Sequence, residues 1–150
     1  MENKALDAVD LSENSLKAVD YLAEVMSCHP KACVTLLHVI MEPSPDIVID
    51  EEQRKQRVEQ LRAESLKLME KAGERLTSRG ISEERIRLLI QVCSKPVSVA
   101  ELILHEQKDG GYDTIVMGKR GMSKREQFLF GSVSSRVVRE ARNCAVWIVD

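Results

Sequence analysis

Two hydrophobic periods alternate along this chain: short apolar runs typical of buried strands, and a spacing of three to four residues typical of amphipathic helices. The apolar runs predict strands over residues 4–9, 34–40, 86–92, 114–117 and 145–149. The helical spacing predicts helices between them, over residues 12–28, 51–79, 96–109 and 133–142. Strands that alternate with helices throughout predict an α/β fold with an open parallel sheet covered on both faces.

Glycine, proline and polar residues refine the expected boundaries. Gly80 and the pair Gly110–Gly111 are expected to end the second and third helices, and Pro96 suits the first turn of the third. Ser132 is a candidate N-cap for the last helix. The apolar stripe expected along the second helix consists of Val58, Leu61, Leu68, Met69, Ala72 and Leu76.

Polar residues inside the apolar runs carry further information. Asp7 interrupts the first strand, where a sheet with two covered faces should be apolar. His38 in the second strand is interpreted as a packed or hydrogen-bonded core residue. Arg87 and Gln91 alternate with apolar residues in the third strand, which therefore favours an edge position.

Composition fits one domain spanning residues 1–150, with 22 basic and 24 acidic side chains. The small net negative charge argues against a nucleic-acid coat or a polybasic membrane anchor. Four cysteines without a CxxC pair, no apolar leader and no apolar run long enough to span a bilayer favour buried or unreactive thiols in a cytoplasmic protein.

Basic charge gathers around one glycine-rich stretch, GKRGMSKREQFLFGS, residues 118–132. Between Gly118 and Arg142 there are seven basic residues and two acidic ones. The stretch lies between an expected strand and an expected helix, whose first amides and macrodipole suit a phosphate. An ordinary strand-to-helix connection is the alternative, and spacing alone does not separate the two.

The spacing Gly118-x-x-Gly121, nine residues, then Gly131-Ser132 resembles the nucleotide-binding signature of the universal stress protein family. The resemblance extends to VDLSENSLKAVDYLAE after the first strand, VTLLHVI, YDTIVMGKRG and CAVWIVD. It implies strand order 3-2-1-4-5, a Rossmann-like arrangement in which strands one and four are neighbours. It also implies binding of ATP with accompanying Mg²⁺, a role in the stress response, and little or no hydrolysis.

The resemblance assigns residues to a nucleotide site beyond strands one and four. Adenine and ribose are expected at Ala8, Val9, Asp10 and Val39, and phosphates along Met117, Gly118, Lys119, Gly121, Gly131, Ser132, Val133 and Ser134. A carboxylate such as Asp10 can accept hydrogen bonds from ribose hydroxyls, although it can equally cap the first helix. Leu11, where many members of the family have glycine, and Asp7 depart from the pattern.

The last strand is also expected to form a homodimer, through Ala145, Val146, Trp147, Ile148 and Val149. An edge strand exposes unpaired amides, and the only tryptophan lies within it. The resemblance implies antiparallel contact between two such strands, whereas burial of Trp147 in the core of its own monomer is the alternative.

Several enzyme classes lack their motifs: the chain contains no GxxxxGK[ST], GxGxxG, HExxH or GxSxG. Two other functions stay open beside the ATP-binding regulatory protein. One is an adenylating enzyme of a related α/β group, which would need a glycine-rich loop where DLSENS stands at residues 10–15. The other is a dimerisation module without nucleotide, which Asp7 and Leu11 would suit.

Overall fold

The computed structural model describes residues 3–10, 12–119 and 131–150. Its elements follow the expected order, each within a few residues of the expected range. The strands are β1 (Lys4–Ala8), β2 (Cys33–Met41), β3 (Ile86–Cys93), β4 (Thr114–Gly118) and β5 (Ala145–Val149). The helices are α1 (Glu13–Ser27), α2 (Glu51–Ser78), a 3₁₀ turn (Glu83–Arg85), α3 (Val99–Gly110) and α4 (Ser132–Glu140).

The five strands form one parallel sheet in the order β3-β2-β1-β4-β5. This confirms the expected order, including the edge position of β3. Successive strands run outward from β1 to β3, and β4 then returns to the other side of β1. The strand order therefore reverses between β1 and β4, whose register pairs Ala8 with Met117.

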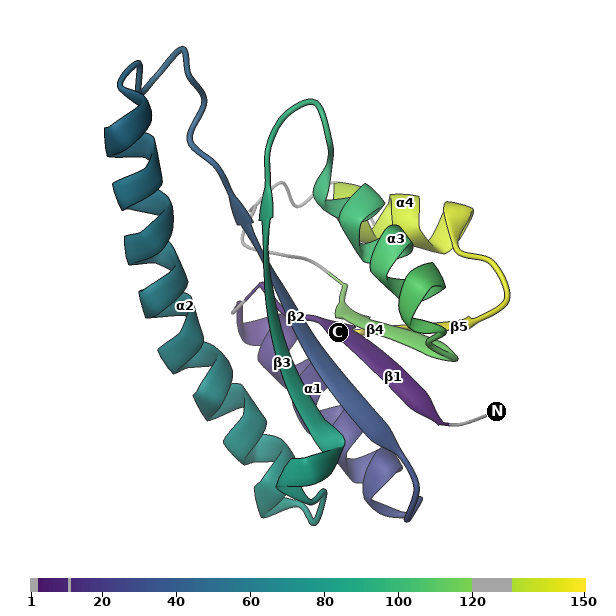
Figure 1. The fold of residues 1–150 in the computed structure, drawn as a ribbon. Coiled ribbons are helices and arrows are strands. Elements are labelled where there is room, and N and C mark those ends of the chain that lie inside the picture. The colour runs from purple at the N-terminus through teal and green to yellow at the C-terminus, as the bar shows by residue number, and fades with distance from the viewer. Residues whose placement is uncertain (1–2, 11, 120–130) are drawn as a thin grey trace.

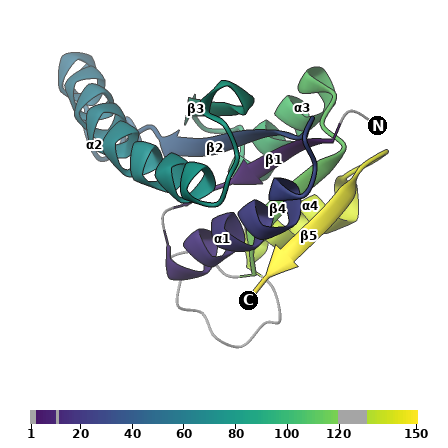
Figure 2. The same ribbon diagram turned by 90° about the horizontal axis from the view of Figure 1, so that it is seen from below.

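Helices cover the sheet on both sides (Figures 1 and 2). One core lies beneath α1 and α2 and contains Val19, Leu22, Leu36, Met69 and Val116. The other lies beneath α3 and α4 and contains Leu6, Leu37, Ile103, Ile115 and Val137. Because successive strand residues face opposite sides, each strand contributes to both cores.

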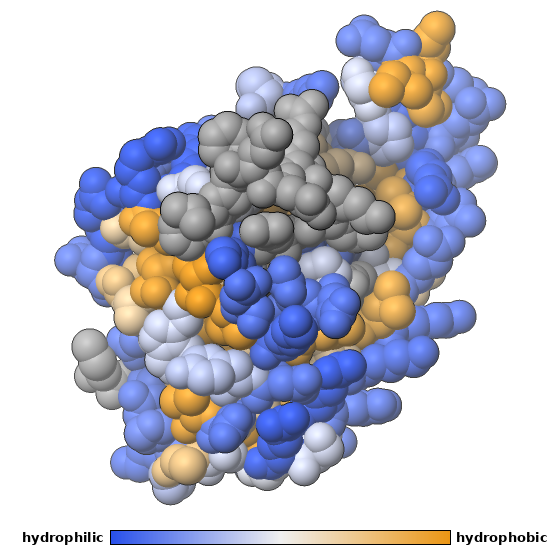
Figure 3. Space-filling model, turned by 180° about the vertical axis from the view of Figure 1, so that it is seen from behind, coloured by the Kyte–Doolittle hydropathy of each residue, from blue (hydrophilic) through white to orange (hydrophobic). Residues whose placement is uncertain are grey.

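The amino-terminal half of α2 extends beyond the sheet (Figure 1). The expected apolar stripe is correct at Met69, Ala72 and Leu76, which are buried, but wrong at Leu68, which is 45% exposed. The preceding loop, residues 42–50, carries the exposed side chains of Ile47 and Ile49. Figure 3 shows hydrophobic surface on the part of the molecule that projects at its upper right. No helix in the described part of the chain is long and apolar enough to cross a membrane.

The start of α3 differs from the expectation. Pro96 lies before the helix, whose N-cap is Ser98. Ser98 Oγ accepts from the Glu101 amide at 3.2 Å, and the Glu101 carboxylate accepts from the Ser98 amide at 3.5 Å. This capping box satisfies the amides of Ser98 and Glu101, so the helix begins after Ser98 rather than at Pro96.

The expected glycine stops are confirmed. Gly111 adopts φ 63° at the end of α3, and Gly80 adopts φ 98° just after α2. Both conformations lie in the left-handed region, where other residues are strained.

Candidate functional site

The candidate site lies at the carboxyl edge of the sheet, where β1 and β4 are neighbours. Ligands of open parallel sheets bind at such a reversal of strand order. Asp10 follows β1 and Gly118 ends β4, so the pairing of these two strands brings both residues to the same edge. The other predicted residues can be placed relative to this pair.

Asp10 supports the cap of α1 without forming it. Its Oδ1 accepts from the Ser12 amide at 2.9 Å, and its own amide donates to Ser15 Oγ at 3.1 Å. Ser12 is the N-cap of α1 and accepts from the Ser15 amide. These bonds hold the Asp10 carboxylate at the edge where a ribose is expected.

Gly118 lies against the backbone of α1. A Cβ built on it would come 2.9 Å from Asn14 C and 2.9 Å from Ser15 N. Real Cβ atoms do not approach backbone that closely, so glycine is required here by the packing of β4 against the first turn of α1. This is a reason for the glycine beyond the turn that the sequence suggested.

The amino terminus of α4 is hydrogen-bonded to Lys119, the residue after β4. The Gly131 amide donates to the Lys119 carbonyl at 3.1 Å, and Ser134 Oγ lies 3.3 Å from the same carbonyl. Gly131 is the N-cap, so the expectation that Ser132 caps this helix is wrong: Ser132 is its first residue. Because Gly131 has no side chain, no side-chain cap covers the first amides, those of Ser132, Val133 and Ser134.

Lys119 is turned toward the end of β5. Its Nζ lies 2.8 Å from Asp150 Oδ2, and its amide donates to the Val149 carbonyl at 2.7 Å. The side chain is 24% exposed. Lys119, which was predicted to contact phosphate, thus forms an ion pair with Asp150.

The residues predicted for adenine lie around the ends of β1 and β2. Val9 is buried, while Ala8 and Val39 are partly buried against the α3/α4 core. The Val9 carbonyl lies 2.7 Å from His38 Nδ1, which confirms the hydrogen bond expected of His38, although the side chain is only partly buried. Since a carbonyl can only accept, Nδ1 carries the hydrogen and holds β1 against β2.

Gly121, with the basic residues Arg120, Lys124 and Arg125, lies outside the described residues. Metal chemistry finds little support elsewhere, because the described residues contain no group of three or more His, Cys, Asp and Glu side chains that could hold an ion.

The thiols are only partly as expected. All four cysteines are free; Cys93 is buried and Cys144 partly buried, but Cys28 and Cys33 are exposed. Burial, and secondarily the Glu101 carboxylate, raises the pKa of the Cys93 thiol, which donates to the Val97 carbonyl at 2.9 Å.

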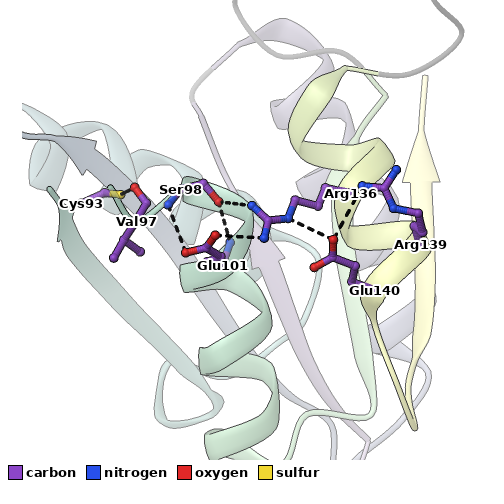
Figure 4. A network of polar contacts seen from close by, with 7 residues as sticks. All are labelled: Cys93, Val97, Ser98, Glu101, Arg136, Arg139 and Glu140. Carbon is purple, nitrogen blue, oxygen red and sulfur yellow. Dashed lines mark hydrogen bonds and ion pairs between the residues drawn. The ribbon is translucent and has the colours of Figure 1, made fainter. Parts of the chain in front are cut away.

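Sequence reasoning missed one polar cluster beside the site. Arg136 on α4 reaches Ser98 and Glu101 at the start of α3 and Glu140 on its own helix (Figure 4). The S-x-x-E pattern of residues 98–101 was a readable signal for the cap, but nothing local links it to Arg136.

The sheet order and the helix layers together define an α/β protein with an open, doubly wound parallel sheet. The family model described as the universal stress protein family matches residues 1–150. The chain therefore belongs to the universal stress protein family.

Individual relatives agree with this assignment. The universal stress protein YxiE of Bacillus subtilis (strain 168) is 32% identical, over 99% of each chain. The solved structure of a protein called MJ0577 is 29% identical with a TM-score of 0.83, covering 99% of this chain and 96% of that one. A universal stress protein solved in complex with cAMP is 20% identical with a TM-score of 0.70, covering 99% and 96%.

Proposed function

We propose that residues 1–150 are one ATP-binding regulatory domain of the stress response, which binds nucleotide between the ends of β1 and β4. The observation that carries the proposal is the amino terminus of α4, whose N-cap Gly131 provides no side-chain cap and is hydrogen-bonded to Lys119 after β4, the strand that pairs with β1. A helix terminus of this kind binds anions through its amides and its dipole. The cAMP-bound relative supports a nucleotide as the ligand.

The roles follow from where the groups lie. The amides of Ser132, Val133 and Ser134 and the hydroxyl of Ser132 would contact phosphates, beside Gly131, whose own amide is bonded to the Lys119 carbonyl. Met117, Gly118 and Lys119 would form the adjoining strand end. Gly121, which lies outside the described residues, stays a predicted phosphate contact. The Asp10 carboxylate would accept from the ribose, and Ala8, Val9 and Val39 would line the adenine. Lys119 would bind phosphate only by leaving Asp150, because its Nζ now pairs with that carboxylate.

Mg²⁺ would accompany the phosphates rather than occupy a protein cage. Magnesium commonly keeps several waters and takes one or two carboxylates plus phosphate oxygens. Asp10 and Asp150 both lie at this edge of the sheet, and because Asp150 pairs with Lys119, Asp10 is the carboxylate proposed for such an ion.

We expect slow or no hydrolysis, and a binding protein of the cytoplasm rather than an enzyme. The Asp10 carboxylate accepts from the Ser12 amide at the start of α1, on the ribose side of the proposed site. Turnover of about 1 per second or faster in contamination-controlled protein would contradict this expectation. Mass spectrometry of the small molecules released on denaturation would show whether intact ATP is carried through purification.

Gly131→Asp tests the site by placing a carboxylate at the N-cap, where the phosphates would lie. Loss of a charge-assisted phosphate contact costs about 1.5–3 kcal/mol, so calorimetry should show ATP affinity falling by an order of magnitude or more. Asn143→Asp is the matched control: it adds the same charge in the exposed turn after α4, where φ is 57° and aspartate is tolerated. ATP binding by Gly131→Asp at the parent's affinity would exclude this site.

We also propose that β5 pairs with a second copy of the chain. An open groove of about 380 Å³ runs along this strand, lined by Tyr21, Trp147, Ile148, Val149 and Asp150. Trp147 packs partly on its own core and meets Tyr21 edge-on at 6.0 Å, while Tyr21 remains 49% exposed. Apolar groups beside an edge strand favour pairing.

The direction of the backbone groups makes this pairing testable. Ala145 donates to the Asp113 carbonyl and Val149 accepts from the Lys119 amide, so Val146 and Ile148 point their amides away from β4. Val146→Pro therefore removes an outward amide and should shift a dimer to monomer in sedimentation at tens of micromolar. Val92→Pro, at the opposite edge of the sheet, is the control that should leave the dimer intact. A monomeric parent would contradict the proposal.

A further inference from the structure

Arg136 joins α4 to the start of α3 through two nitrogen atoms and contacts its own helix through the third (Figure 4). Its Nη1 donates to Ser98 Oγ at 2.8 Å, and its Nη2 lies 2.9 Å from Glu101 Oε1. Its Nε lies 3.1 Å from Glu140 Oε1, one turn further along α4. A planar guanidinium held at three nitrogens has little freedom to rotate, so the contact fixes direction as well as distance.

The partner of Arg136 is itself fixed. Ser98 and Glu101 form the capping box of α3, and that helix is anchored by the buried side chains of Ala100 and Ile103. The loop before it is tied down as well: Cys93 Sγ donates to the Val97 carbonyl at 2.9 Å, and the Glu42 amide donates to the Cys93 carbonyl at 2.8 Å. Contacts therefore continue from Arg136 to the end of β2, the strand that carries Val39.

α4 is a short helix with few buried side chains. It is nine residues long, Val137 and Ser134 are buried, and Val133 packs partly against the α3/α4 core. Ser134 and Gly131 fix its amino terminus to the Lys119 carbonyl, which leaves rotation about the helix axis to be set further along. Arg136 lies at that point, and rotation of the helix would re-aim the amides of its first turn.

We propose that Arg136 is a positioning residue for phosphate: by holding α4 to Ser98 and Glu101, it aims the first amides of α4 and sets their distance from the end of β2. Arg136 touches no phosphate itself. The inference rests on the proposed nucleotide site and adds the contact that keeps the first turn of α4 at a fixed distance from the end of β2.

Arg136→Met is the primary test, because methionine retains an aliphatic side chain and removes every donor. Calorimetry on the full chain should show ATP binding weakened about 5- to 20-fold, with adenosine binding changed by less than about 2-fold. Arg136→Lys, which keeps the charge but loses the planar fork, should fall between parent and Arg136→Met. An equal loss for ATP and adenosine would indicate general damage and overturn the inference.

Two variants separate positioning from simple charge. Arg139→Met removes the same charge from the same helix, but Arg139 is 72% exposed and, within the described part of the chain, forms an ion pair with Glu140 alone. Its ATP affinity should change by less than about 2-fold. A loss as large as that of Arg136→Met would assign the effect to charge and overturn the inference.

Glu101→Gln separates the two explanations, because they predict opposite changes in ATP affinity. It removes a negative charge, so a purely electrostatic effect would tighten ATP binding, whereas loss of the Arg136 ion pair should weaken it about 2- to 5-fold. Glutamine preserves the capping box, which keeps α3 intact. Tighter ATP binding by Glu101→Gln would overturn the inference.

A measurement without nucleotide distinguishes failure of this inference from failure of the site. Hydrogen exchange of the α4 amides should be faster in Arg136→Met than in the parent, and unchanged exchange would overturn the inference. A parent that binds neither ATP nor adenosine would contradict the proposed function, whereas a parent that binds ATP as tightly as Arg136→Met does would contradict the positioning role alone.

Discussion

The face of the sheet beneath α1 and α2 and the face beneath α3 and α4 bury polar groups in different ways. On the first face Asp7 is completely buried between Ala5 and Val9, and neither carboxylate oxygen has a hydrogen-bond partner within the described residues. Burial raises the pKa of Asp7 well above its usual value, so the carboxyl keeps its proton.

On the second face the buried polar groups have partners. The Tyr112 hydroxyl, 3.0 Å from Thr35 Oγ1 and 3.2 Å from Glu106 Oε1, can accept from the threonine while it donates to the carboxylate. Glu106 also accepts from Gln91 at 3.1 Å. Hydrogen-bonded groups of this kind fix the position of α3. The Asp7 carboxyl, which has no hydrogen-bond partner within the described residues, only lowers the stability of the fold.

The largest effect is expected from Asp7→Val, which should raise the free energy of unfolding at pH 7 by about 1–3 kcal/mol. In the parent, the unfolded chain loses the Asp7 proton above its pKa of 3.8 while the fold retains it. Parental stability therefore falls as pH rises from there toward the folded pKa, by about 1.4 kcal/mol per pH unit. Urea denaturation at pH 4.5, 5.5 and 7 should show the advantage of the variant growing with pH.

Asp7→Asn separates the two causes, because it removes the titration but leaves a buried polar group of the same size. Its stability should lose the pH dependence without reaching that of Asp7→Val. Parallel pH profiles for the parent and both variants would mean that Asp7 is not protonated in the fold.

Gly118→Ala should destabilise by about 1–3 kcal/mol, because the new Cβ meets the backbone of Asn14 and Ser15 at 2.9 Å and one element must shift. Gly73→Ala is the control on the same face. Its Cβ would lie 3.7 Å from Leu88 Cδ2, an ordinary contact, and alanine favours the helix by about 0.5–1 kcal/mol. Thermal unfolding should therefore move in opposite directions for the two variants.

Tyr112→Phe tests the partnered face and should lower stability by about 1–2 kcal/mol, because Thr35 and Glu106 lose their shared hydroxyl. Tyr21→Phe removes a hydroxyl from a side chain that is 49% exposed and should change stability by less than about 0.5 kcal/mol. Equal effects in chemical denaturation would show that the network adds nothing beyond an ordinary surface hydroxyl.

The smallest effect is expected from Asp20→Asn, which breaks the ion pairs between α1 and α2. Asp20 lies 2.7 Å from Arg75 and 3.9 Å from Arg79, with all three side chains at least 30% exposed. Exposed pairs contribute about 0.2–1 kcal/mol, and added salt should shrink the difference. A loss above 2 kcal/mol that persists at high salt would show that this pair behaves as a buried one.

Strand and helix locations were predictable because they depend on local periodicity and on glycine stops, as at Gly80 and Gly111. The misplaced features have specific causes. A capping box moved the start of α3 past Pro96, and Gly131 took the N-cap position expected for Ser132. Leu68 fitted the spacing of the helical stripe, but no described element covers its side chain enough to bury it.

The strand order followed from the family resemblance, since periodicity alone does not order strands. That order, together with the glycine spacing, located the candidate site at the ends of β1 and β4. The side-chain contacts within it were less predictable. Lys119 pairs with Asp150, which lies 31 positions away, and Asp10 accepts from the Ser12 amide at the start of α1.

The sequence by itself determined the elements, their alternation and the concentration of glycine and basic residues after β4, because each is a property of neighbouring residues. The tertiary structure alone decided which polar groups found partners. Arg136 contacts Ser98, which lies 38 positions away in the sequence. Asp7, by contrast, has the apolar residues Ala5 and Val9 as its neighbours on the same face of β1. A hydrogen bond or ion pair between residues far apart in the sequence forms only where folding brings the two groups within about 3 Å. The local sequence pattern does not contain that distance.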